Sequence, residues 1–200
     1  SGAGDVNGDG FTDVLIGANL HDGLVGVDEG QAFLYLGSAG ALSPTAAWTA
    51  ASGQVGAGFG QSVSSAGDVN GDGFGDIVVG SLFFDNGETD EGMAFLYLGS
   101  LAGPSLIPDW TYESNQISAR LGVSVASAGD VNGDGFGDLV VGANLYDNVE
   151  INEGAAFLFL GSALGLQASE DWISESDQDQ ARFGRHVAPA GDINGDGFGD

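Results

Sequence analysis

Residues 68–76 read Asp-Val-Asn-Gly-Asp-Gly-Phe-Gly-Asp, and near copies of this nine-residue string begin at Asp5, Asp130 and Asp192. The four starts are 63, 62 and 62 residues apart. A second marker keeps the same period of 62 residues, a tryptophan that recurs as Trp48, Trp110 and Trp172. Because independent markers share one register, the chain is built from a repeated structural unit.

Within one repeat the local patterns predict short strands. Residues 59–66 alternate larger and small side chains, residues 76–80 form a brief apolar run, and residues 94–98 are apolar on both faces. A weaker fourth strand is expected around 110–112. Turn residues separate these segments, and no window has the period of a capped helix.

Four short antiparallel strands in each repeat predict an all-β fold, a β-propeller built of four-stranded blades. The rungs of a β-helix are much shorter than 62 residues, and one repeat has too few strands for a sandwich. Residues 1–200 are expected to form one propeller portion of about three blade equivalents. We expect three strands, then two complete blades, then one final strand. Either the chain is part of a longer propeller, or several chains close a ring.

The composition excludes several classes of partner. The chain has 29 acidic residues against three arginines, no lysine, and a net charge of −26. A phosphate-binding surface needs clustered cations, so nucleic acid is not an expected partner. No apolar run approaches the ~18–20 residues of a membrane span, so no membrane insertion is expected. There is no cysteine, no repeated histidine and no Gly-x-Ser-x-Gly motif, so we predict no enzyme activity.

The nine-residue strings have the chemistry of a calcium loop. Positions 1, 3, 5 and 9 carry side-chain oxygens, position 7 offers a backbone carbonyl, and the glycine at position 6 permits a tight turn. Oxygen donors without histidine or cysteine favour Ca²⁺ over Zn²⁺. An EF-hand would need a glutamate at position 12, where Ile16, Val79 and Val141 stand. The alternative is a metal-free turn capped by its own side chains.

These motifs resemble the FG-GAP repeat of integrin α-subunit propellers and of bacterial surface proteins. Phe59-Gly60 stands at the "FG" position and Gly80-Ser81 at the "GAP" position, although Leu121 replaces the phenylalanine in one copy. The near identity of the copies is similar to that of bacterial arrays. The resemblance implies calcium ligands at Asp5, Asn7, Asp9, Phe11, Asp13, Asp68, Asn70, Asp72, Phe74, Asp76, Asp130, Asn132, Asp134, Phe136, Asp138, Asp192, Asn194, Asp196, Phe198 and Asp200, the phenylalanines through their backbone carbonyls.

The predicted function is a calcium-binding extracellular or cell-surface scaffold, secreted and of bacterial type, for adhesion or recognition of a protein or glycan ligand. Two alternatives stay open, a propeller domain of a polysaccharide-degrading enzyme and a structural spacer of a surface array. The tryptophans are expected to pack between blades rather than to stack on sugars. The recurring Glu29, Glu91 and Glu153 suggest a hydrogen bond to a neighbouring strand. A second cation near the acidic loops at Asp85 and Asp147 is left open.

Overall fold

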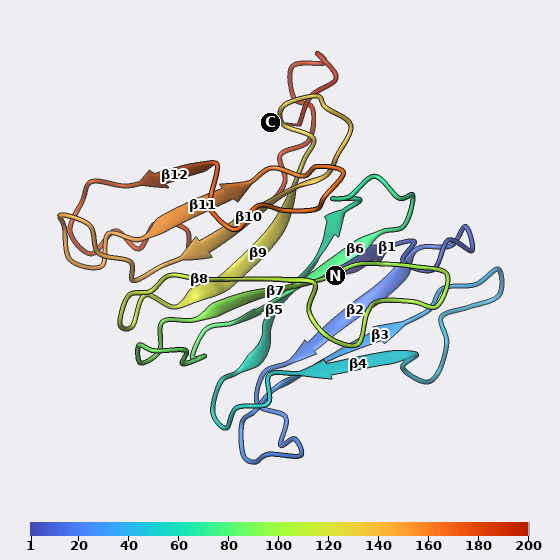
Figure 1. Cartoon of the computed structure of the whole chain (residues 1–200), viewed down its shortest axis with the longest axis horizontal. Helices are drawn as coiled ribbons and strands as arrows, with labels where there is room; N and C mark the ends of the chain where they lie inside the picture. The colour runs from blue at the N-terminus through green and yellow to red at the C-terminus, as the bar shows by residue number, and fades with distance from the viewer. Residues whose placement is uncertain (200) are drawn as a thin grey trace.

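The computed structural model describes residues 1–199 and consists of three four-stranded antiparallel sheets, each in sequential strand order. The sheets fan out from their first strands as propeller blades do (Figure 1). Residues 1–199 contain no helix, as the sequence predicts. The first blade comprises β1 (Gly2–Gly4), β2 (Asp13–Ala18), β3 (Gln31–Tyr35) and β4 (Trp48–Ala51).

The second and third blades repeat the same plan with longer first strands. The second comprises β5 (Phe59–Gly67), β6 (Asp76–Ser81), β7 (Met93–Tyr97) and β8 (Trp110–Glu113). The third comprises β9 (Leu121–Gly129), β10 (Asp138–Ala143), β11 (Ala155–Phe159) and β12 (Trp172–Glu175). The weak fourth strand that the sequence predicts is therefore present in every blade.

Two expectations about the chain ends are wrong. The first blade has four strands rather than three, because Gly2–Gly4 pairs with β2. The single strand expected after the third blade is absent from residues 183–190, where Phe183 makes only an isolated bridge to Gly154. Its equivalents β5 and β9 pair with the strand that follows the nine-residue string, and this sequence has no such strand after Asp192.

The core lies between blades, which explains why the central strands are apolar on both faces. Every residue of β6 is buried. Ile77 and Val79 belong to the apolar cluster shared with the first blade, whereas Val78 belongs to the cluster shared with the third. Alternate side chains of one strand thus point into two different interfaces, so burial of both faces removes the usual polar alternation.

Backbone contacts join each blade to the next. The N–H of Leu121 donates to the carbonyl of Glu91 over 2.9 Å, and the first and third blades make the equivalent bonds. A Cβ added at Gly80 would lie 2.0 Å from the carbonyl oxygen of Gly122 in the next blade. The "GAP" glycine is required because the "FG" backbone occupies the space of a side chain. The hydrogen bond predicted at the recurring glutamates exists, and it is made by their backbone carbonyls.

Candidate functional site: the acidic hairpin loops

Each nine-residue string connects the first and second strands of a blade. In the second blade residues 68–75 join β5 to β6, and Gly67 pairs with Asp76 across the hairpin. The loops of successive blades follow one another along the upper right of Figure 1. Since a strand lies on either side of each of the first three loops, the prediction of a hairpin loop rather than an EF-hand is confirmed.

The first aspartate organises the turn. In the second blade the Asp68 carboxylate accepts the N–H groups of Gly71, Asp72 and Gly73 at 2.7, 3.1 and 2.9 Å. Asp72 in turn accepts the N–H of Phe74 at 3.0 Å. These bonds curl the backbone around the acidic side chains, and they recur in the third loop and at Asp192 in the fourth.

The last aspartate of the string ties the loop to the rest of its blade. Asp76 is fully buried, and its two oxygens accept the N–H groups of Val69 in the loop and Gly99 after β7, both at 2.8 Å. Asp13 and Asp138 are equally buried and make the equivalent pairs of bonds. Position 9 is therefore a buried structural junction, whereas position 5 of each loop is exposed.

The charge of this buried carboxyl is poorly compensated within the chain. Burial raises the pKa of Asp76, the N–H groups of Gly99 and Val69 oppose the rise, and the charges of Asp72 and Asp68 add to it. The resulting pKa is about 7. A divalent cation among these oxygens would supply the missing positive charge, so the donor set fits a hard cation such as Ca²⁺.

Neighbouring loops also touch one another. The N–H of Gly75 in the second loop donates to the Asp5 carbonyl of the first at 2.8 Å, and equivalent bonds link the later loops. The Phe74 ring lies over Gly8, where an added Cβ would come within 2.7 Å of a ring carbon. Whatever fixes the shape of one loop therefore also fixes part of the contact between two blades.

The predicted side chains lie together in their loops, with one qualification of geometry. Among residues 1–199, the carboxylates of a loop do not form a trio with oxygens all within 4.8 Å of one another. Ligands on opposite sides of a Ca²⁺ ion lie about 4.6–5.2 Å apart, twice the Ca–O distance, so such a trio is not required. Asp200, the last predicted ligand of the fourth loop, falls outside the described residues.

The tryptophans occupy the blade interfaces, as predicted. The Trp48 indole N–H donates to the Ser105 carbonyl in the next blade at 2.9 Å, and the Trp110 indole donates to Gln167 at 2.7 Å. Trp48 also meets the Tyr97 ring edge-on at a centroid distance of 5.0 Å. Trp172 occupies the same position of the third blade, where it is 50% exposed.

One acidic group escaped the sequence reasoning. Glu153, Glu175 and Asp177 come together at the opposite end of the third blade from its hairpin loop. They are separated in sequence by more than twenty residues and share no contiguous motif. The available signal was the comparison of repeats, because Glu175 and Asp177 replace Ala51 and Gly53 of the first blade.

The fold and the loops together define a class, a propeller of four-stranded blades with an acidic hairpin loop in each. Residues 1–35, 59–97 and 121–159 match the FG-GAP repeat family, one match for each blade. The chain belongs to this family, and the resemblance seen in its motifs is confirmed.

Integrin alpha chains are among its similar proteins. The chain is 33% identical to integrin alpha-5 of Xenopus laevis over 82% of its own length, and 34% identical to integrin alpha-IIb of Mus musculus over 70%. It is 29% identical to integrin alpha-PS2 of Drosophila melanogaster over 87%. The chain spans only 13–16% of the length of these three relatives.

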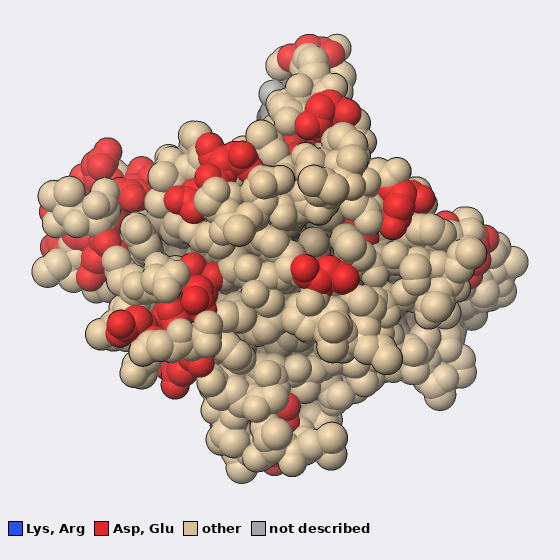
Figure 2. Space-filling view, viewed as in Figure 1, with Lys and Arg blue, Asp and Glu red and all other residues tan. Residues whose placement is uncertain are grey.

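Surface features accompany this assignment. On the face shown in Figure 2, Asp and Glu side chains appear in several groups and no Lys or Arg is visible. No helix in residues 1–199 is long and apolar enough to cross a membrane.

Proposed function

We propose that the chain is a calcium-stabilised portion of an extracellular β-propeller that acts as a non-catalytic scaffold for adhesion or ligand recognition. The observation that carries the calcium part is Asp76, a buried carboxyl whose pKa is raised to about 7 beside two further carboxylates. Such an arrangement stabilises the chain poorly by itself and well around a divalent cation.

The ligands proposed for each ion are the side-chain oxygens at positions 1, 3, 5 and 9 and the backbone carbonyl at position 7. In the second blade these are Asp68, Asn70, Asp72, Asp76 and Phe74. The hydrogen bonds within the loop are compatible with this role, because a carboxylate has about four lone-pair sites and can accept an N–H while it holds a cation. The sets in the first, third and fourth loops follow the same positions.

The bound ion would act as a clamp between strands and between blades. Position 9 reaches the glycine that follows the third strand of its blade, and the loop backbone is bonded to the preceding loop. An ion that fixes the loop therefore also fixes these contacts. Since extracellular calcium modules work at ~10⁻⁴–10⁻³ M, sites of modest affinity would stay filled outside the cell.

The recognition part of the proposal rests on the family and on the integrin alpha relatives. Loops at the ends of rigid, stacked blades are suitable for binding, because the scaffold fixes them. The proposed partner is a protein or a glycan, and further blades or copies of the chain would complete the propeller.

A binding screen tests this function. The chain is applied to arrays of glycans and of extracellular-matrix proteins, in calcium and in EDTA, and polysaccharides are assayed for cleavage in parallel. We expect retention by at least one ligand in calcium, at least tenfold reduced in EDTA, and no turnover. Turnover would instead support the polysaccharide-degrading alternative, and retention by no ligand would support the structural spacer.

A further inference from the structure

The third blade contains a second buried acid that the hairpin loops do not involve. Glu153 directly precedes the short segment that leads into β11, and it is fully buried. Its Oε1 atom accepts the N–H groups of Asn148, Val149 and Glu150 at 2.8, 3.1 and 3.3 Å. Its Oε2 atom is buried without any hydrogen-bond partner. A buried oxygen without a donor is costly, so a missing ligand at this atom needs to be considered.

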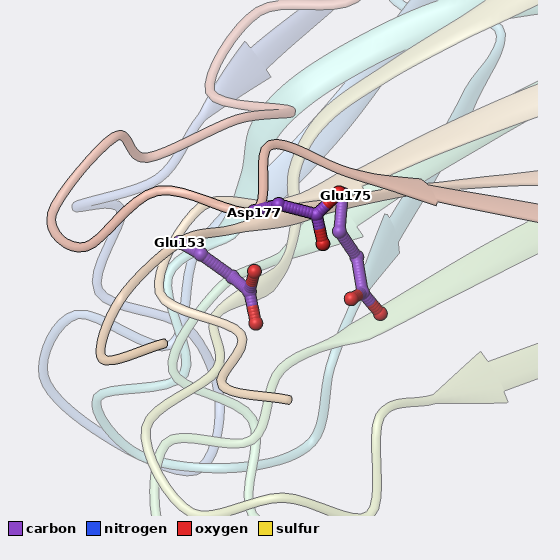
Figure 3. A group of neighbouring side chains, drawn as sticks. All are labelled: Glu153, Glu175 and Asp177. Carbon is purple, nitrogen blue, oxygen red and sulfur yellow. The ribbon is translucent and has the colours of Figure 1, made fainter. Parts of the chain in front are cut away.

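Two further carboxylates converge on the same place. Glu175 ends β12 and Asp177 follows two residues later. One oxygen from each of Glu153, Glu175 and Asp177 lies within 4.8 Å of the other two. Figure 3 shows the three carboxylates directed toward a common space. The amide of Asn148 donates to Oε2 of Glu175 at 2.9 Å, which leaves Oε1 of Glu175 available.

The first blade shows what this position looks like without the additional acids. There Ala51 and Gly53 replace Glu175 and Asp177. Glu29, the counterpart of Glu153, has both oxygens satisfied by backbone, with Val25 donating to Oε2 at 3.2 Å and Gly53 donating to Oε1 at 2.9 Å. The unpartnered oxygen therefore appears together with the added carboxylates and is not a general property of the repeat.

The second blade is intermediate. Oε1 of Glu91 accepts the N–H groups of Asn86 and Glu88, whereas its Oε2 is buried without a partner. The added groups there are Glu113 and Asn115. Two blades thus share the unpartnered oxygen, and the third has the complete set of three carboxylates.

We infer that Glu153, Glu175 and Asp177 form a Ca²⁺ site that is separate from the hairpin loops and lies at the opposite end of the blade. The donors are all oxygens, without sulfur or imidazole, which selects a hard cation. Although burial would raise the pKa of Glu153, the surrounding N–H groups hold it below its usual value, so the carboxylate is ionised and ready to bind.

The ion would connect three segments that are distant in sequence. Glu153 holds the loop of residues 148–150 and its backbone carbonyl accepts the N–H of Phe183, the first residue after the blade that contacts it. Glu175 and Asp177 belong to the outer strand and the turn that follows it. Calcium at this position would therefore fasten the outer strand to the connection that leads toward the next blade.

The test converts the third blade into the first. The double variant Glu175→Ala/Asp177→Gly reproduces Ala51 and Gly53, a combination that the fold already tolerates. The charge-matched control is Glu150→Gln/Asp179→Asn, which removes two nearby acids outside the trio. Bound ⁴⁵Ca²⁺ is counted by equilibrium dialysis on the full chain at saturating calcium, and folding is checked by thermal melting in EDTA.

We expect the double variant to bind one Ca²⁺ fewer per chain than the wild type, and the control to bind the same number. An unchanged count in a folded double variant would overturn the inference. A loop variant, Asp72→Ala, separates this result from the proposed function, because it removes a loop ion and leaves the trio intact. If the loops bind no calcium, the wild type will show a single site that the double variant abolishes.

Discussion

The two ends of the third blade each bury an acid, but they do so in different ways. At the hairpin end both oxygens of Asp138 accept N–H groups, and burial with the neighbouring Asp134 and Asp130 still raises its pKa. At the other end the N–H groups concentrate on one oxygen of Glu153, lower its pKa and leave the second oxygen unpartnered. The hairpin end lacks charge compensation and the other end lacks a ligand, so a cation would answer a different need at each.

Calcium removal should have the largest effect, because it acts on all of the loops. A site filled at 100 times its Kd contributes about 2.7 kcal/mol. For three such loops in a domain of this size, EDTA should lower Tm by about 10–25 °C. Differential scanning calorimetry in calcium, in EDTA and after calcium is restored provides the measurement. An unchanged Tm would mean that the loops are metal-free turns.

Removal of the buried junction should come next. Asp76→Ala leaves the N–H groups of Val69 and Gly99 buried without acceptors, so we expect a loss of about 2–5 kcal/mol even in EDTA. The exposed Asp72→Ala should cost within about 1 kcal/mol in EDTA and show its main effect only in calcium. Urea unfolding under both conditions separates the two. Equal losses in EDTA would contradict the structural role assigned to position 9.

The raised pKa predicts an unusual pH dependence of the metal-free chain. The Asp76 carboxyl has a folded pKa of about 7 against an ordinary value of 3.8, so the folded state binds more protons between these values. Stability in EDTA should therefore increase as pH falls from 8 to 5, by an amount on the order of 3 kcal/mol. In calcium the trend should reverse, since protons displace the ion. The same trend with and without calcium would exclude a metal at this aspartate.

The smallest effect is expected at the Glu153 end. Glu175→Ala/Asp177→Gly should lower Tm in calcium by about 4–10 °C, the share of a single site, and should change it little in EDTA. The control Glu150→Gln/Asp179→Asn should leave both values unchanged. A loss of stability in EDTA as large as that in calcium would show that these acids act through structure alone.

The repeat made most of the fold predictable. The tryptophan register located the blades because an indole is needed at each interface, and the apolar run 76–80 predicted a strand covered on both sides. The loop ligands followed from spacing within nine contiguous residues. The turn alternative also anticipated real features, since the loop aspartates do accept backbone N–H groups from their own turn.

Other features depend on contacts that a linear pattern does not contain. The close approach of Gly80 to Gly122 joins residues 42 positions apart, and the trio around Glu153 joins three segments of a blade. The final strand was predicted from its similarity to β5 and β9, but a strand forms only where a partner is present. Pairing partners, rather than local preference, decided that outcome.

The central claim is that the hairpin loops hold calcium. Crystals grown in millimolar calcium, with anomalous differences collected at a wavelength where calcium scatters anomalously, test it directly. We predict a peak in each of the loops at residues 5–13, 68–76 and 130–138, with oxygen neighbours at about 2.3–2.6 Å. Loops without such peaks, in crystals soaked with ample calcium, would contradict the account.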